Sequence, residues 1–170
     1  GADGDARADL GDWKRRIDRR SRRSNLAVDS DLSGKLACYL SLLASWNRKI
    51  NLTALDDRDA AVDRLVLEPL LAARHVSGAR SLMDVGSGGG SPAIPMKLVL
   101  PGCRLCMVES KIRKSAFLRE AARQLELEDT RIESRRFEEL LTQPAFHEAF
   151  DVVSIRAVRV EAETLRSLQA

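Results

Sequence analysis

Three glycines at alternate positions follow a short apolar run that ends in an acid. In LMDVGSGGGSPAIP, residues 82–95, Asp84 ends the run and is followed by Gly86, Gly88 and Gly90, before a helix-compatible segment. Glycines let the backbone approach a bulky ligand and adopt positive φ without steric strain. The N-terminus of a following helix favours a polar or anionic ligand group. The stretch predicts a strand, a ligand-binding turn and a helix, although a plain tight turn has a similar composition.

The spacing of this loop distinguishes between two classes of nucleotide-like ligand. A dinucleotide-binding loop would have its last glycine at position 91, where this chain has Ser91. The observed order, D-x-G-x-G-x-G, is similar to that of S-adenosylmethionine-binding loops in Rossmann-like methyltransferases. A second acid, Glu109, ends the next predicted strand about 20 residues later, where a carboxylate can accept hydrogen bonds from ribose hydroxyls. The loop and the acid together favour ligand binding over a plain turn.

The elements that must position these residues alternate between strands and helices. We expect helices over residues 32–47, 59–75, 92–100, 111–125 and 160–170, a helical turn over 137–141, and strands over 80–85, 103–109, 130–134 and 149–155. Asp31 or Ser33 is expected to cap the first helix, and Pro69 to kink or divide the second. The alternation predicts an α/β fold with a mainly parallel sheet and right-handed crossovers.

The charge distribution suggests three regions within the 170 residues. Lys and Arg total 28 against 25 Asp and Glu, and basic residues crowd the stretch from Lys14 to Arg23 with one acid, Asp18. Such a run is typical of a solvated, disordered arm, and a polyanion-binding arm is the alternative. We therefore expect a basic disordered arm over residues 1–30, a helical segment over 31–78, and an α/β core over 79–170.

The cysteines and histidines argue against a metal or disulfide framework. Cys103 and Cys106 have C-x-x-C spacing, but both fall in a predicted strand, where positions three apart face opposite sides. His75 and His147 have no partner at metal-ligand spacing. We expect no bound metal, no membrane segment, and a reducing, cytoplasmic location.

Five blocks of the chain carry a resemblance to a known family. They are WNRKINLT, DVGSGGGSPAIP, ESKIRKSAFL, RRFEEL and FDVVSIRAV, within about residues 40–158. In this order they resemble the signatures of the RsmG (GidB) family, the guanine-N7 methyltransferases of small-subunit ribosomal RNA. The resemblance implies a Rossmann-like methyltransferase fold, an S-adenosylmethionine cofactor, and 16S ribosomal RNA or a 30S precursor particle as partner. We expect a monomer.

The resemblance also implies roles for individual residues. The cofactor-binding candidates are Asp84, Gly86, Ser87, Gly88, Gly90, Ser91, Glu109, Phe137, Glu138 and Arg156. Glu109 would hold the ribose, whereas Phe137 and Glu138 would border the adenine. Core packing is the alternative for Phe137, and a solvated helix surface is the alternative for Glu138. Arg156, the one catalytic candidate, would lie at the mouth of the site.

The candidates for RNA binding are Arg113, Lys114 and Arg136. Arg113 and Lys114 begin a predicted helix, where acids are normally favoured, so this pair suggests contact with phosphate. A solvated helix face is the alternative for both residues.

The chain departs from the family pattern at several positions. Leu65 stands where the family has His, Pro69 where it has Ser, and Ala93 where it has Gly; Glu68 also replaces an Asp. The family continues through further strands after Arg156, so the C-terminal strands of the sheet are expected to be missing. These departures leave two alternatives open: a small-molecule methyltransferase of the same fold, or a catalytically weakened cofactor- or RNA-binding homologue.

Overall fold

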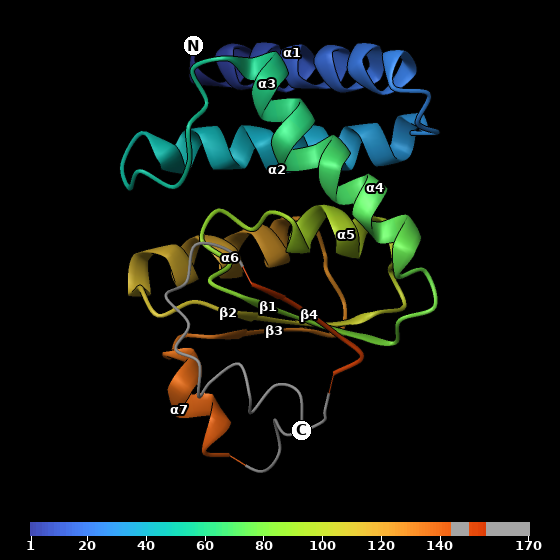
Figure 1. The fold of residues 1–170 in the computed structure, drawn as a ribbon. Coiled ribbons are helices and arrows are strands. Elements are labelled where there is room, and N and C mark those ends of the chain that lie inside the picture. The colour runs from blue at the N-terminus through green and yellow to red at the C-terminus, as the bar shows by residue number, and fades with distance from the viewer. Residues whose placement is uncertain (144–149, 156–170) are drawn as a thin grey trace.

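The computed structural model describes residues 1–143 and 150–155 as two helical layers on one face of a parallel sheet (Figure 1). In chain order the elements are α1 (Ala2–Arg23), α2 (Ser30–Asn47), α3 (Arg58–Val62), the π-helical η1 (Asp63–Leu67), α4 (Glu68–His75), β1 (Ser81–Val85), α5 (Ala93–Val99), β2 (Arg104–Val108), α6 (Ile112–Gln124), β3 (Thr130–Glu133), α7 (Phe137–Leu141) and β4 (Val152–Ile155). Helices α5 and α6 cover the sheet, and α1 and α2 lie beyond them.

The sheet confirms the predicted fold class. Its strand order is β3-β2-β1-β4, and all three pairs of neighbours are parallel. From β1 the chain moves outward to β2 and β3, then returns to the other side of β1. Right-handed crossovers put helices on opposite faces when the direction reverses, which explains why α7, unlike the other described helices, lies below the sheet in Figure 1. The reversal creates a switch point beside the carboxyl end of β1, where ligands of α/β folds bind.

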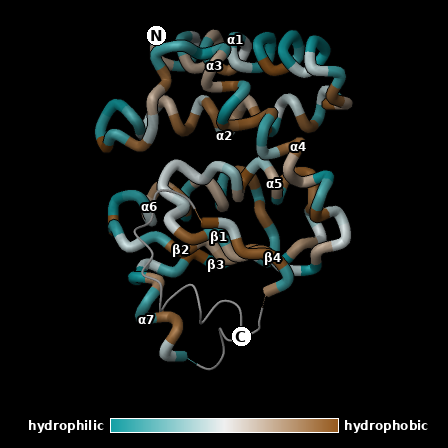
Figure 2. The backbone as a smooth tube through the Cα atoms, viewed as in Figure 1, coloured by the Kyte–Doolittle hydropathy of each residue, from teal (hydrophilic) through white to brown (hydrophobic). Residues whose placement is uncertain are grey.

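The strands separate two hydrophobic clusters. The larger cluster fills the space between the sheet and the helices and includes Tyr39, Leu40 and Phe117, all fully buried. The smaller one, on the opposite face, joins strand residues to Phe137 and Leu140 of α7. Figure 2 shows the hydrophobic strands β1 and β4 in brown and the largely hydrophilic α1 in teal. Packing on both faces requires strands that are apolar on both sides.

Cys103 and Cys106 belong to different clusters, as expected for opposite faces. Both are free thiols, and burial raises the pKa of Cys103 above its ordinary value and that of Cys106 to about 11. Both thiols therefore stay protonated near neutral pH, which makes them poor nucleophiles.

The expectation of a disordered arm over residues 1–30 was wrong, because residues 2–23 form α1. Trp13 and Ile17, on the inner face of this helix, are fully buried. Arg16 and Arg19 donate to Asp59 at 2.9 and 2.6 Å, and Arg20 pairs with Asp63. The apolar face and acids about forty positions away stabilise the helix together, and a local count of charges detects neither.

The pairing runs in both directions between α1 and α3. Arg58, on α3, donates to Asp9 at 2.6 Å and to Asp12 at 2.9 Å, and its guanidinium stacks over the Trp13 ring at 4.2 Å. Much of the basic run is thus engaged with the protein itself. A free polyanion-binding arm is accordingly not supported by the structure.

Helix α2 is capped by Asp29 rather than by Asp31 or Ser33. The Asp29 carboxylate accepts a hydrogen bond from Leu32 N at 2.8 Å, at the third position after the cap. Ser33 instead donates its hydroxyl to the Asp18 carboxylate at 2.5 Å. That contact joins α2 to α1, so the fold uses Ser33 for packing between helices.

The interruption expected at Pro69 is a π-helical segment, η1, that ends at Leu67, and Pro69 stands at the start of α4. The Glu68 amide donates to the Asp63 carbonyl five residues earlier. Pro69 has no N–H to offer the Leu65 carbonyl, its usual partner in an α-helix. That carbonyl instead accepts a hydrogen bond from the Ser91 hydroxyl at 2.8 Å. The proline therefore frees an acceptor that ties η1 to the glycine loop.

A search of the described residues finds no helix long and apolar enough to cross a membrane.

We predict that Asp59→Asn lowers the free energy of unfolding by about 1 kcal/mol at pH 7, since Asp59 accepts from two partly exposed arginines. Hydrogen bonding from Arg16 holds the pKa of Asp59 below its ordinary value of 3.8. The carboxylate therefore contributes fully above that pH and loses its contribution as the pH falls through the lowered value. Urea denaturation between pH 2 and 7 should show the difference from the parent chain shrink with acidity.

Asp31→Asn is the matched control, because Asp31 pairs only within α2, with Lys35 at 3.2 Å, among the described residues. It should have a smaller effect. Equal losses in the two variants would contradict a stabilising role for the contact between α1 and α3.

Candidate active site

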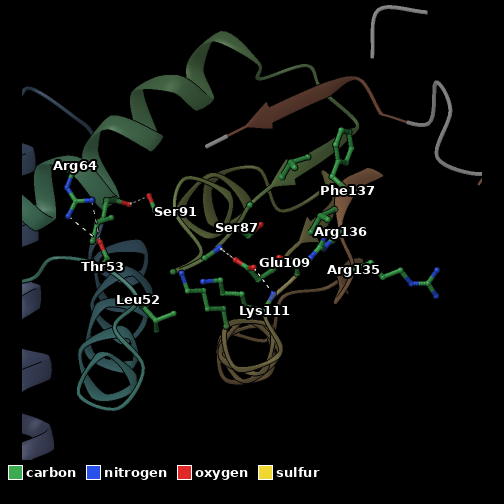
Figure 3. Close-up of a pocket in the computed structure, with 18 residues that line it drawn as sticks. Leu52, Thr53, Arg64, Ser87, Ser91, Glu109, Lys111, Arg135, Arg136 and Phe137 are labelled. Carbon is green, nitrogen blue, oxygen red and sulfur yellow. Dashed lines mark hydrogen bonds between the residues drawn. The ribbon is translucent and has the colours of Figure 1, made fainter. Parts of the chain in front are cut away.

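A cavity of about 510 Å³ lies at the carboxyl ends of β1 and β2 (Figure 3). Its floor is the glycine loop, residues 86–89, with residues 109–111 beside it. One end is formed by residues 135–137, and the other by residues 52–53, 64–65 and Ser91. The cavity therefore lies over the carboxyl ends of β1 and β2, next to the switch point of the sheet, and is closed on one side by the helical layer.

The glycine loop has the backbone conformation that its spacing predicts. Gly86, Gly88 and Gly90 have φ values of 75°, 51° and 86°, a region that residues with a Cβ rarely adopt. The amides of Gly86 and Ser87 both donate to the Val108 carbonyl, at 2.9 and 3.1 Å, so the loop is attached to the end of β2. The positive φ values at these three glycines let the backbone itself line the cavity at residues 86–89.

Gly88 and Gly90 are needed for different reasons. A Cβ at Gly88 would meet its nearest neighbour at 3.8 Å, so this position is restricted by its backbone conformation rather than by space. A Cβ at Gly90 would lie 2.6 Å from Cδ1 of the fully buried Ile94. Gly90 also does not line the cavity. Although we expected Gly90 to contact the cofactor, close packing of the loop on α5 explains it better.

Asp84 lies behind the loop rather than in the cavity. It is 1% exposed, and its carboxylate accepts hydrogen bonds from the Ser87 hydroxyl at 2.7 Å and from the Ser154 hydroxyl. These bonds connect β1 to its own loop and to β4. The structure thus assigns Asp84 to holding the loop, and Ser87 lines the cavity with its hydroxyl already engaged.

Glu109 occupies the position predicted for it, at the end of β2. Its side chain is almost buried, with the residue 7% exposed. One carboxylate oxygen accepts from Gly88 N at 3.0 Å and the other from Lys111 N at 2.9 Å. A carboxylate oxygen can accept two hydrogen bonds, so each oxygen retains one site. The two backbone bonds fix the carboxylate while leaving it able to receive two hydroxyl groups.

The opposite wall is built by the WNRKINLT block, to which the sequence analysis assigned no site residue. The Asn47 side chain accepts from Leu52 N at 2.6 Å and Thr53 N at 2.9 Å. This bends the chain after α2 so that Leu52 and Thr53 line the cavity. Arg64 joins the same wall and donates to Thr53 Oγ1 at 3.3 Å. The repeated asparagine of the block was the available signal for this turn.

Basic side chains surround the cavity. The lining includes Arg64, Lys111, Lys114, Arg135 and Arg136. Among the described residues, Arg135 is the member of this set with an acidic neighbour, Glu133 at 3.9 Å. The predicted Lys114 and Arg136 thus line the cavity. The sequence analysis missed Arg64, Lys111 and Arg135, because only the folded chain brings these residues to one cavity.

Besides Asp84 and Gly90, two predicted site residues lie outside the cavity, and a third, Phe137, serves two purposes. Arg113 is exposed outside it, and Glu138 is exposed on α7, consistent with its alternative as a solvated acid. Phe137 lines the cavity and also packs in the smaller cluster, so both interpretations of it agree with the structure. Arg156 lies outside the described residues. Within those residues, no group of three His, Cys, Asp or Glu could hold a metal ion.

We predict that Gly90→Ala destabilises the protein by about 1–3 kcal/mol, as overpacking of a core does. Gly88→Ala should cost less, about 1 kcal/mol, because it shares the positive φ but its Cβ would meet no atom closer than 3.8 Å. Ile94→Val removes Cδ1 and should restore part of the loss when combined with Gly90→Ala. Thermal and urea denaturation of the four variants measure this coupling, and strictly additive losses would refute the proposed contact.

Comparison with known proteins identifies the family. A family model described as "rRNA small subunit methyltransferase G", of the GidB family, matches residues 33–169. The chain is 36% identical over 146 residues to ribosomal RNA small subunit methyltransferase G of Neisseria gonorrhoeae (strain NCCP11945), covering 79% of this chain and 70% of that protein. It is 37% identical over 139 residues to the protein of the same name from Roseiflexus sp. (strain RS-1), covering 81% and 59%.

Solved structures agree on the fold at much lower identity. A putative O-methyltransferase from Klebsiella pneumoniae superposes with a TM-score of 0.59 and 18% identity, covering 94% of this chain and 67% of that one. An O-methyltransferase from Bacillus cereus, solved with SAH, gives 0.52 and 21%, covering 87% and 63%. These matches support the Rossmann-like methyltransferase fold. With the family match over most of its length, the chain belongs to the GidB family of small-subunit ribosomal RNA methyltransferases.

Proposed function

We propose that this chain transfers the methyl group of S-adenosylmethionine to ring nitrogen 7 of a guanine in 16S ribosomal RNA. The observation that carries the proposal is the cavity at the switch point, where Glu109 is held beside Gly88 with acceptor sites remaining. Membership of the family supplies the substrate class, and the resemblance of the five sequence blocks supplies the position of the methyl group.

The residues present fit this cofactor. A side chain at Gly88 would stand within 4.0 Å of the Glu109 carboxylate, in the space that a ribose needs beside that acid. The Phe137 ring offers an apolar surface for a purine at the α7 end of the cavity. When bound, S-adenosylmethionine supplies an electrophilic methyl group on a sulfonium. The protein's part is to hold the ribose, cover the purine and leave the methyl group facing the substrate.

The chemistry requires little acid–base help from the protein. Nitrogen 7 of guanine carries an in-plane lone pair and has no proton to remove. Glu109 is the one acid among the described lining residues, and its hydrogen bonds make it an acceptor for hydroxyls rather than a base. The chain would then act through alignment of the two reactants and exclusion of water. Arg156 is proposed to lie where cofactor and base meet.

The basic surroundings of the cavity favour RNA over a small molecule. Lys111, Lys114 and Arg136 have no acidic partner within the described part of the chain, so they can contact phosphates. On α1, Arg16, Arg19 and Arg20 are paired with aspartates. RNA phosphates are therefore expected at the cavity mouth, where the unpaired cations adjoin the proposed cofactor site. A monomeric state and a cytoplasmic location stay predictions.

Glu109→Gln should weaken S-adenosylmethionine binding by about 1–3 kcal/mol, because an amide nitrogen would face one of two backbone N–H groups and one acceptor would be lost. Calorimetry with S-adenosylmethionine measures the change. Glu138→Gln is the matched control, since Glu138 is exposed outside the cavity, and it should bind as the parent chain does. Equal affinity of the Glu109 variant and the parent would remove the ribose assignment.

Lys114→Ala should reduce affinity for 16S ribosomal RNA. The slope of log affinity against log salt concentration should become smaller by about one, as expected for the loss of one phosphate contact. Lys35→Ala removes the same charge from α2, where Lys35 pairs with Asp31, and should leave both quantities unchanged. Filter binding between 50 and 200 mM salt, roughly the range over which such contacts weaken, provides the measurement. Identical slopes in both variants would place the RNA elsewhere.

The decisive experiment is transfer of a labelled methyl group to 16S ribosomal RNA and 30S particles that lack the native modification. We expect 7-methylguanosine as the labelled nucleoside. Cofactor binding without transfer would support the weakened homologue, and transfer to small molecules but not RNA would support the small-molecule enzyme.

A further inference from the structure

Arg64 differs from its arginine neighbours in having neutral partners. It donates to Thr53 Oγ1 at 3.3 and 3.4 Å and to the Ala54 carbonyl at 3.0 Å. Arg58, six positions earlier, is paired with two aspartates. Across the part of the chain that the structure describes, no acidic side chain pairs with Arg64. Its positive charge is therefore not neutralised by the protein around it.

The position of this charge is set by several independent contacts. Asn47 bends the segment that presents Thr53, and Thr53 holds the Arg64 guanidinium. Arg64 itself lies in the π-helical η1, whose Asp63 is paired with Arg20 of α1. π-Helical turns are frequent at functional sites, since the extra residue re-aims the side chains around it. These contacts hold a cation at the cavity wall although nothing described there balances it.

Arg64 stands at one end of the cavity and Phe137 at the other. In Figure 3, Arg64, Thr53 and Ser91 lie on one side of Glu109, and Phe137 and Arg136 lie on the opposite side. If the ribose is at Glu109 and the purine is at Phe137, the remaining part of the cofactor and the target nucleotide must lie toward Arg64. Both carry oxyanions: an amino-acid carboxylate and a phosphate.

We propose that Arg64 is the oxyanion-binding residue at this end of the cavity, a specificity-determining contact that rests on the proposed function. At most three of its five N–H donors are used by Thr53 and Ala54, so others remain for a ligand. A planar guanidinium suits a carboxylate or a phosphate, because two parallel N–H groups can meet two oxygens. The neutral partners orient the group without competing as a counter-ion would.

The test compares Arg64→Gln and Arg64→Lys with the parent chain by calorimetry and RNA binding. The calorimetric probes are S-adenosylhomocysteine and decarboxylated S-adenosylmethionine, the second of which lacks the carboxylate. If Arg64 binds the carboxylate, Arg64→Gln should lose about tenfold or more in affinity for the first probe and keep its affinity for the second. Arg64→Lys should recover part of the loss. Arg74→Gln, an exposed arginine on α4, is the control and should change neither affinity.

If Arg64 binds a phosphate, both small probes should bind Arg64→Gln normally. Affinity for 16S ribosomal RNA and its salt dependence should then fall, whereas Arg74→Gln leaves them unchanged. A folded Arg64→Gln that matches the parent in all three measurements would overturn the inference. Failure of the parent chain to bind S-adenosylhomocysteine at all would instead overturn the proposed function, so the two failures are distinguishable.

Discussion

The pair of hydrogen bonds that backbone amides donate to the Glu109 carboxylate is the constraint on which the site depends. Gly88 N belongs to the loop after β1, and Lys111 N precedes α6, so one carboxylate joins the loop to the segment after β2. The loop also donates two amides to the Val108 carbonyl at the end of β2. The glycine conformations and the position of the acid are thus parts of one arrangement. Removing the carboxylate would affect both loop order and hydroxyl binding.

The helical layer is attached to the glycine loop by two hydrogen bonds with residues far from it in the sequence. Pro69 leaves the Leu65 carbonyl without its helical donor, and the Ser91 hydroxyl takes that role. On the neighbouring side, the Tyr39 hydroxyl donates to the Gly89 carbonyl at 2.6 Å. Both bonds attach the helices to the glycine loop. The departure of Pro69 from the family pattern therefore has a structural partner in Ser91, a residue of the loop itself.

The chain divides its basic residues between two tasks. On α1, Arg16, Arg19 and Arg20 pair with Asp59 and Asp63 and hold the outer helices together. Those around the cavity are mostly without acidic partners in the described residues, which leaves them available to anions. The formal net charge of +3 does not reveal this division, because the count gives a basic residue the same weight whether or not an acid pairs with it.

The sequence by itself determined the order of elements from α2 to β4, the parallel sheet and the positions of Gly86, Gly88 and Glu109. These depend on local patterns: apolar runs, alternate glycines with positive φ, and an acid at a strand end. Only the tertiary structure decided that residues 2–23 are helical, that Gly90 and Asp84 support the loop, and that Arg64 and Thr53 form a wall. The helix and the role of Asp84 depend on partners distant in the chain, Asp59 for Arg16 and Ser154 for Asp84, whereas the role of Gly90 depends on how Ile94 packs against the loop. Long-range pairings leave no periodic trace in the sequence, so they become visible only when the fold brings the partners together.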